Sequence, residues 1–570
     1  MEWWTHLWLN EGFATWISYL AVDSFFPEWK IWSQFLEHTE GGLRIDALEQ
    51  SHPIEVEVGH ARSVDEVFDA ISYLKGSAVI RMLKDYLGDK IFQNSLSSYI
   101  KKFACKNAKT EDLWKVLSEE ANVAVNKMMD TWTKQKGYPL ISVRLKGQNL
   151  EFEQSQFLSS GLQGGGQWIV PISFSTGSYT RFNKFLLETK FGRIDISELL
   201  DSSKGNPPSF ENKIQGKCDE DIWVKVNVEQ TGFYRVKYED ELASRLKKAI
   251  QNNSLSGADK FGILDDAYAL CEACEVSFSS LLSLMDVYRG ELDYIVLSRL
   301  TEICLSVAKI SADAIPDLVY RLKRFLINLL LSSAERLGWD PKSGESHLDS
   351  LLRGKVLIGL ATFGHDKTQK EATKRFKDFI NDTNTQLLPA DTRRAAYVAI
   401  MRNSSVKDRK GLEDLLNIYK KAEEVQEKRR VLRTLATSSD PDLVLEVLDL
   451  LLSNEIRDQD VIYVLAWISL EGRETAWKWL KDNWEIILSR WGHGRGMLLT
   501  HFVEGIVTPF SSHQMADEIE AFFTNWPNLS INMTVKQSIE QVRIKARWVD
   551  HISQEEPSLQ ELINGLADRG

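Results

Sequence analysis

The sequence predicts an α+β fold made of a helical first part, a small β-sandwich and an α-helical solenoid. Three observations carry this prediction. Apolar residues first recur at helical spacing, then alternate with polar residues, and then return to helical spacing for the rest of the chain. We therefore expect three domains, at residues 1–137, 138–239 and 240–570.

The first domain is expected to contain an amphipathic helix from Leu9 to Asp23. Glu11 lies away from the apolar stripe of this helix, which is expected to be its buried face. Further helices are expected until Gly137-Tyr138-Pro139 ends them. The stripes consist of Leu9, Phe13, Trp16, Ile17 and Leu20, then Val79, Ile80, Leu83 and Leu87, then Leu113, Val116 and Leu117.

The second domain shows the alternation of period two that is typical of strands. Turns rich in Gly and Pro, at 161–166 and 205–208, separate the runs. About 100 residues of short strands predict a small β-sandwich that ends near Tyr238. The alternating runs lie at 141–145, 150–152, 168–174, 182–187 and 223–228.

The third domain has helical patterns and short connections over some 330 residues. Such helices are expected to stack in pairs, as in an α-helical solenoid of the HEAT or armadillo kind. The stripes include Leu242, Leu246 and Ile250, and Val444, Val447, Leu448 and Leu451, with breakers at 252–253, 388–391 and 439–441.

The composition is that of a folded protein without a nucleic-acid partner. Hydrophobic residues make up 43% and charged residues 26% of the chain, which excludes a disordered or low-complexity protein. The 69 Lys+Arg and 81 Asp+Glu give a net charge of −12, and an acidic surface repels phosphate backbones. No apolar run reaches the roughly 18 residues that a membrane helix needs, so we expect no transmembrane segment.

The cysteines favour a reducing compartment. Five in so long a chain are too few and too scattered for a disulfide scaffold, which predicts a cytoplasmic location. Peripheral membrane association stays open. The cysteines are Cys105, Cys218, Cys271, Cys274 and Cys304.

Tryptophans crowd the start of the chain, where six fall within the first 32 residues. So much indole surface needs partners, so we expect that the chain lacks a preceding segment and that Trp3, Trp4 and Trp8 form an exposed edge. Whether the short start is a true isoform or an incomplete gene model stays open.

Glu11 carries the strongest local signal, in the stretch Trp8-Leu9-Asn10-Glu11-Gly12-Phe13-Ala14. A carboxylate near the start of an apolar helix is costly to bury unless it caps the helix, pairs with a cation or binds a metal. From the residue types alone, capping or an ion pair is favoured over metal ligation. Tyr73, judged likewise from its residue type alone, is best explained as a core aromatic residue.

Four stretches of the sequence match a known family, namely Met1–Ala14, Ile71–Gly76, Gly232–Val236 and Ala476–Leu480. They resemble the gluzincin family of zinc metalloaminopeptidases, of the puromycin-sensitive type. Because the stretches lie in all three predicted domains, the resemblance covers essentially the whole chain. It implies that the first domain is the C-terminal helical part of a thermolysin-like domain.

The resemblance implies that Glu11 is a zinc ligand. In the family, two histidines of an H-E-x-x-H motif and a later glutamate hold the ion, and Glu11 matches that glutamate. The match places both histidines before Met1, and H-E-x-x-H is absent from this sequence, as is the G-x-M-E-N motif that holds the substrate amine. A lone carboxylate does not select zinc, so this chain alone is not expected to hold the ion stably.

The resemblance also implies a catalytic role for Tyr73, the tyrosine whose hydroxyl stabilises the oxyanion in the family. Leu74 departs from the family's serine but leaves Tyr73 and Lys75 in register. Lys75 is expected on the surface or next to the site residues.

The implied function is a zinc metalloaminopeptidase that releases N-terminal residues from peptides by zinc-activated attack of water. Because two ligands and the general base are missing, we expect the isolated chain to be inactive. The alternative is a non-catalytic solenoid that binds peptides or serves as a scaffold, for example in association with a full-length relative. Basic clusters at 393–394 and 428–430 are expected on solvated helix faces. On the concave side of the solenoid they would instead attract the C-terminal carboxylate of a peptide.

Overall fold

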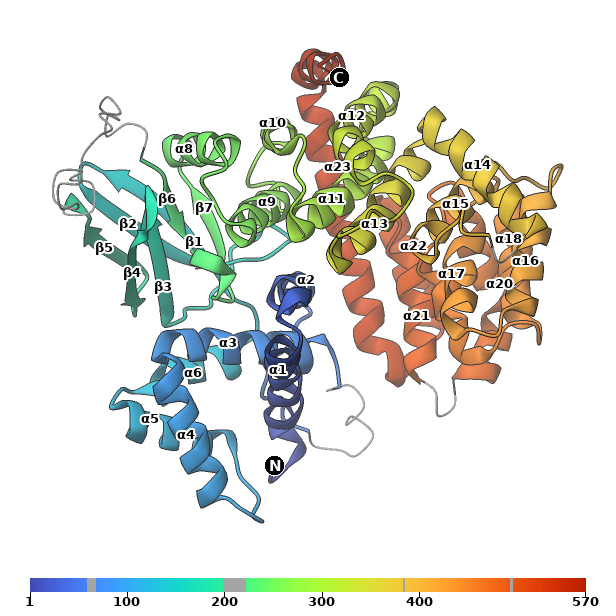
Figure 1. Cartoon of the computed structure of the whole chain (residues 1–570). Helices are drawn as coiled ribbons and strands as arrows, with labels where there is room; N and C mark the ends of the chain where they lie inside the picture. The colour runs from blue at the N-terminus through green and yellow to red at the C-terminus, as the bar shows by residue number, and fades with distance from the viewer. Residues whose placement is uncertain (59–67, 198–221, 383–384, 493–495, 570) are drawn as a thin grey trace. The chain divides into compact units, whose positions relative to one another are not determined.

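The structure is a computed structural model of the whole chain (Figure 1). The chain divides into two compact units, Met1–Val276 and Ser277–Gly570. The three domain boundaries expected from the sequence stay predictions. The structure describes residues 1–58, 68–197, 222–382, 385–492 and 496–569.

The first unit begins with helices, as predicted. A π-helical turn, η5, continues directly into helix α3. The predicted stripes in α3 and α5 are buried, apart from Leu87, which is partly exposed. The elements are α1 (Trp8–Phe25), α2 (Ile31–Asp46), η5 (Ile71–Lys75), α3 (Gly76–Leu87), α4 (Asp89–Lys102), α5 (Thr110–Ala121) and α6 (Val125–Thr133).

The buried face of α1 differs from the predicted one. Its buried residues are Trp8, Gly12 and Trp16, which follow one another at the spacing i, i+4. Ile17 and Leu20 are 53% and 37% exposed, so the predicted stripe is wrong at these two positions. The reason is that α1 contacts α3 through Gly12. A hydrophobic pattern considers only apolar side chains, so it cannot predict a contact made by glycine.

The strands form two sheets, with the orders β5-β2-β1-β7 and β4-β3-β6. The β1–β7 pair is parallel and the other pairs are antiparallel. Phe152 in the first sheet contacts Phe174 and Phe185 in the second, with ring centroids 6.4 and 4.9 Å apart. The strands are β1 (Pro139–Lys146), β2 (Asn149–Gln156), β3 (Val170–Thr176), β4 (Ser178–Leu187), β5 (Phe191–Asp195), β6 (Val224–Val226) and β7 (Arg235–Tyr238).

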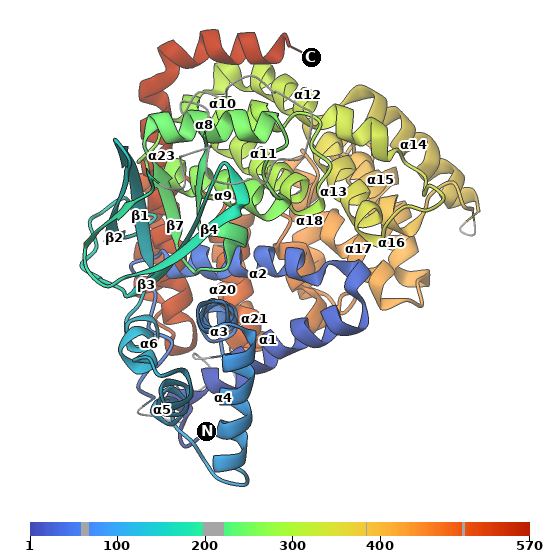
Figure 2. The same cartoon turned by 60° about the vertical axis from the view of Figure 1, so that its left-hand side comes forward.

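The predicted strand runs are present, but the sequence pattern missed β5 and β7, the two edge strands of the first sheet. Helices α8 (Asp240–Gln251) and α9 (Gly257–Glu272) pack against the β6 and β7 side of the sheets (Figure 2). The predicted turn at 205–208 lies outside the described residues.

The second unit is helical. Helices α11, α13, α15, α17, α19 and α21 form a row in which each contacts the next, and α12, α14 and α16 each pack against the helix that follows them. The final helix α23 packs against α10, α11, α12, α21 and α22. Together with the two small sheets of the first unit, these helices give the mixed helical and small-sheet content that the sequence predicts. The helices are α10 (Phe278–Met285), α11 (Tyr294–Ala314), α12 (Val319–Leu337), α13 (His347–Phe363), α14 (Asp366–Asn381), α15 (Ala390–Arg402), α16 (Lys410–Lys421), α17 (Val425–Leu435), α18 (Pro441–Leu452), α19 (Ile462–Leu465), α20 (Arg473–Trp491), α21 (Gly496–Val507), α22 (His513–Asn525) and α23 (Asn532–Ala567).

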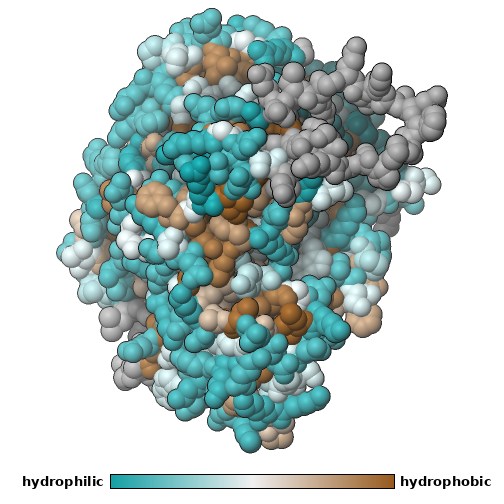
Figure 3. All heavy atoms as spheres, turned by 90° about the vertical axis from the view of Figure 1, so that its left-hand side faces the viewer, coloured by the Kyte–Doolittle hydropathy of each residue, from teal (hydrophilic) through white to brown (hydrophobic). Residues whose placement is uncertain are grey.

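Large apolar side chains remain on the surface. Figure 3 shows apolar patches among hydrophilic residues on one face of the molecule. At the start of the chain, Trp3 is 56% exposed, whereas Trp8 is completely buried and donates a hydrogen bond to Thr110. The expected exposed edge is therefore wrong for Trp8.

Two further predictions concern the whole chain. In the part of the chain that the structure describes, no helix has the length and apolar character needed to cross a membrane. No disulfide joins the described cysteines, and Cys218 lies outside the described residues.

Candidate functional site

Helix α1 and the η5–α3 segment meet through two glycines. A Cβ atom added at Gly12 would lie 3.1 Å from the carbonyl carbon of Gly76, and one added at Gly76 would lie 3.5 Å from the Cα atom of Gly12. No side chain separates the two backbones at this point. This close approach places Glu11, the neighbour of Gly12, beside the segment that carries Tyr73.

Helix α2 holds the same segment from another side. A Cβ atom added at Gly41 or Gly42 would lie 3.1 Å from side-chain atoms of Leu74. One added at Gly42 would also lie 3.2 Å from the backbone nitrogen of Lys75. The π-helical turn is therefore fixed between two helices by close backbone packing. Turns of this kind are frequent at functional sites.

The structure brings Glu11 and Tyr73 together. Both side chains are partly exposed. Burial raises the pKa of the Tyr73 phenol above its ordinary value, and the hydrogen bond to Glu11 and the negative charge of Glu11 raise it further. The phenol therefore stays protonated at neutral pH and is available as a hydrogen-bond donor.

Lys75 is completely buried, which excludes the expected surface position and leaves the expected position next to the site residues. Its Nζ atom lies 2.8 Å from Oδ2 of Asp46, which is also completely buried, and it donates a hydrogen bond of 3.0 Å to the carbonyl of Gly137. The other carboxylate oxygen of Asp46 accepts hydrogen bonds from Ser51 and from the Gly137 amide. This ion pair ties the last residue of η5 to the end of α2.

Asp69 caps the start of the same turn. Its Oδ1 atom accepts hydrogen bonds of 3.0 and 3.1 Å from the backbone amides of Ile71 and Ser72. Its Oδ2 atom lies 2.6 Å from Nε2 of His52. Burial lowers the pKa of His52, but the hydrogen bond to Asp69 and the charge of Asp69 outweigh it, and the net pKa is raised.

This raised pKa predicts how the stability depends on pH. A histidine with a raised folded-state pKa stabilises the fold fully below its unfolded-state pKa of about 6.5 and loses this contribution as the pH rises through the folded-state value. We therefore expect the His52→Gln variant to lose more unfolding free energy at pH 5.5 than at pH 8.5. Urea unfolding of both proteins across this range measures the difference, and an equal loss at both ends would contradict the assignment.

The described residues do not by themselves fit a zinc site at Glu11. A catalytic zinc needs three protein ligands. Among the described residues, His6, Glu55 and Glu111 are the group of three metal-ligating side chains that converge, and Glu11 does not belong to it. No step of a reaction is therefore assigned to a metal at Glu11.

The predicted basic clusters of the second unit differ in their partners. Arg393 and Arg430 both pair with Glu427. Arg394 instead lies over the ring of Trp467, 3.8 Å from its centroid, and its Nε and Nη2 atoms are buried without a hydrogen-bond partner. Burial, followed by the charge of a neighbouring arginine, lowers the pKa of Arg394 to about 10. The expectation of simply solvated faces is therefore wrong for Arg394.

Comparison with known proteins covers most of the chain. Residues 1–132 match the Peptidase family M1 domain, and residues 223–544 match the ERAP1-like C-terminal domain.

The sequence is similar to several aminopeptidases over nearly its full length. It is 53% identical over 567 residues to Aminopeptidase M1 of Arabidopsis thaliana, which covers 100% of this chain and 64% of the relative. It is 51% identical to Aminopeptidase M1-B of Oryza sativa subsp. japonica, over 99% of this chain and 63% of the relative. It is 30% identical to Puromycin-sensitive aminopeptidase of Caenorhabditis elegans, over 96% of this chain and 57% of the relative. The chain thus spans less than two thirds of the length of these relatives.

Proposed function

This chain belongs to the M1 family of aminopeptidases, and we propose that it forms part of a zinc enzyme that releases N-terminal residues from peptides. The contact between Glu11 and Tyr73 carries this proposal. Glu11 matches the family's third zinc ligand, and Tyr73 matches its oxyanion donor. The two residues lie 62 positions apart in the sequence, yet their side chains interact. The glycine contact between α1 and α3 produces this proximity.

Each residue has a separate role in the complete enzyme. Glu11 supplies one carboxylate to the zinc site. In the family, two histidines of another segment supply the other two protein ligands. The Tyr73 hydroxyl donates a hydrogen bond to the oxygen that becomes negatively charged when water attacks the scissile carbonyl. Asp46 and Lys75 touch neither substrate nor metal, and they position the turn that presents Tyr73.

The isolated chain is proposed to be inactive, since it lacks the H-E-x-x-H motif with its two ligands and its base. We expect no release of the fluorophore when the purified chain is incubated with a fluorogenic aminoacyl substrate and zinc. Release that depends on zinc and disappears in the Tyr73→Phe variant would show that the chain is an enzyme by itself. The Tyr320→Phe variant is the matched control, because Tyr320 is 80% exposed.

A non-catalytic peptide-binding protein is the second candidate, and Arg394 favours it. Its Nε and Nη2 atoms lack hydrogen-bond partners, and a small rotation of the partly exposed side chain would let a peptide carboxylate supply them. The helical pairs of the second unit would then act as a HEAT-like or armadillo-like solenoid that binds peptide without turnover. Fluorescence anisotropy of a labelled peptide with a free or an amidated C-terminus tests this candidate, and equal affinities would contradict it.

Peptides are the partners common to both candidates. A cytoplasmic location, inferred from the use of cysteine, belongs to the same proposal. Association with a full-length relative would bring the missing ligands to Glu11.

A further inference from the structure

We propose that His6, Glu55 and Glu111 form a binding site for a divalent transition metal, with zinc as the best-fitting ion. The site uses neither Glu11 nor Tyr73 and does not depend on the proposed peptidase function. Its three residues come from three separate places in the first unit. His6 ends the short helix η1 (Trp4–His6), Glu55 follows α2, and Glu111 lies in the first turn of α5.

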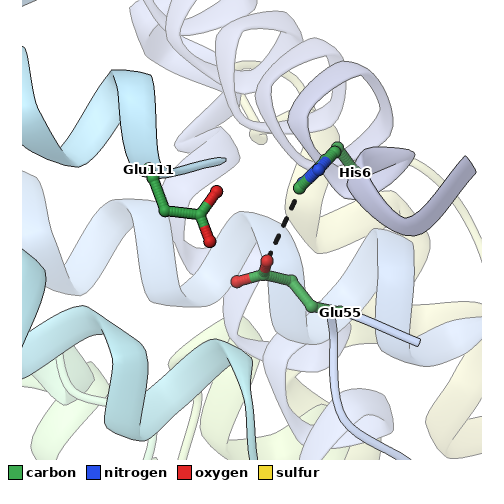
Figure 4. Close-up of side chains that lie close together, drawn as sticks. All are labelled: His6, Glu55 and Glu111. Atoms are coloured by element: carbon green, nitrogen blue, oxygen red, sulfur yellow. Dashed lines mark ion pairs between the residues drawn. The ribbon is translucent and has the colours of Figure 1, made fainter. Parts of the chain in front are cut away.

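The three side chains converge on one point (Figure 4). One ligand atom of each lies within 4.8 Å of those of the other two. Ligands that share a zinc ion at about 2 Å lie roughly 3 to 4 Å from one another, so a small closure completes the site. Glu111 can make this movement, because its side chain is 56% exposed.

His6 presents a lone pair to the site. Its Nδ1 atom lies 2.9 Å from the Thr110 hydroxyl and accepts a hydrogen bond of 3.4 Å from the Thr110 amide. Because the amide can only donate, Nδ1 is an acceptor, so the hydroxyl donates its proton to Nδ1 while its oxygen accepts from the indole of Trp8. Nδ1 is therefore an unprotonated nitrogen, as a metal requires of histidine. The hydroxyl of Thr110 can rotate away when an ion takes its place.

Glu55 supplies an independent indication of a ligand. Its side chain is only 6% exposed, and its carboxylate points toward His6 and Glu111 (Figure 4). Its Oε1 atom is buried and has no hydrogen-bond partner. Its Oε2 atom lies 3.7 Å from Nδ1 of His6, which is too far for a hydrogen bond. A buried carboxylate oxygen without a partner is costly, and a metal ion bound to Oε1 removes this cost.

The surrounding charges also favour a cation. Lys134 lies between Glu111 and Asp130, at 3.3 and 3.1 Å from their oxygens. Glu55 carries a further carboxylate in the same group. Three carboxylates thus face one lysine. A divalent ion balances this excess of negative charge.

The donor set selects the class of ion. One imidazole and two carboxylates suit zinc and its transition-metal neighbours, whereas calcium and magnesium prefer oxygen ligands alone. Three protein ligands leave a fourth position for water. No local sequence pattern predicts this site, because its ligands are 49 and 56 residues apart in the chain.

Isothermal titration of the chelator-treated full chain with zinc chloride tests the proposal. We expect binding to the wild-type chain, and a loss of affinity of about tenfold or more in Glu55→Gln and in Glu111→Gln, since even residues that only support a ligand are worth 10 to 100-fold. Glu111→Gln is the safer variant for the fold because its side chain is exposed, and thermal melting verifies that each variant folds.

One matched control and one discriminating variant give the test its specificity. Glu188→Gln removes an exposed carboxylate that pairs with Lys127, and it is expected to bind zinc like the wild type. Glu11→Gln removes the ligand of the proposed peptidase and so distinguishes zinc held at Glu11 from zinc held at His6, Glu55 and Glu111. Absence of binding to the wild type would overturn the proposal, and so would unchanged affinity in folded Glu55→Gln and Glu111→Gln. Zinc affinity that falls only in Glu11→Gln would also overturn it, while supporting Glu11 as the ligand of the proposed peptidase.

Discussion

Replacing Asp46 by asparagine is expected to lower the unfolding free energy by about 3–5 kcal/mol, because it leaves Lys75 charged and buried without its partner. Both side chains of this pair are completely buried, and their charged atoms are 2.8 Å apart. Asparagine keeps the shape of the side chain and an oxygen that accepts from Ser51 and Gly137. The loss therefore reports on the charge.

Urea unfolding monitored by tryptophan fluorescence measures this effect. Glu188→Gln is the matched control, because Glu188 and Lys127 form an exposed pair with side chains 51% and 65% exposed. Exposed pairs contribute about 1 kcal/mol or less. A loss in Asp46→Asn as small as in this control would contradict the assigned role of the buried pair. The double variant Asp46→Leu/Lys75→Met is expected to recover part of the stability, since it removes both buried charges.

Replacing Tyr73 by phenylalanine is expected to lower kcat by about 10²–10³-fold in an active form of the enzyme, with little change in KM. Removal of one hydrogen-bond donor to the developing oxyanion lowers kcat by a factor of this size, because the hydrogen bond strengthens in the transition state. The measurement requires a joined protein, in which a segment of an M1 relative that carries H-E-x-x-H and G-x-M-E-N is fused before Met1. Steady-state kinetics with an aminoacyl substrate then give both constants.

Tyr320→Phe in the joined protein is the control for Tyr73→Phe. Tyr320 is 80% exposed, so its hydroxyl is expected to affect neither constant. A drop in kcat confined to Tyr73→Phe, with unchanged melting temperature, agrees with a catalytic hydroxyl. An equal kcat in Tyr73→Phe and in the wild type would remove Tyr73 from the reaction.

The periodic elements of the fold were predictable from the sequence, and the exceptions have physical causes. Strands such as β1 and helices such as α18 bury one regular face, so their pattern is visible in the chain. The edge strand β5 alternates between exposed and partly exposed residues, so it carries little apolar signal. Ile17 and Leu20 were assigned to the buried face of α1 because a hydrophobic pattern cannot recognise that Gly12 makes the contact.

The candidate site was predictable only in part. Glu11 and Tyr73 were found through the family resemblance, whereas their proximity depends on a glycine contact between two helices. The buried position of Lys75 escaped prediction because its partner, Asp46, lies 29 residues away at the end of another helix. The group of His6, Glu55 and Glu111 escaped it for the same reason, since convergence of distant residues leaves no local pattern.

The turnover of the joined protein, compared with that of the isolated chain, tests the central claim most directly. Zinc content is a weaker criterion, because the site at His6 would bind the ion whether or not Glu11 does. The claim predicts that the joined protein releases the fluorophore from an aminoacyl substrate and that the isolated chain does not. Release by the isolated chain at the rate of the joined protein would contradict it.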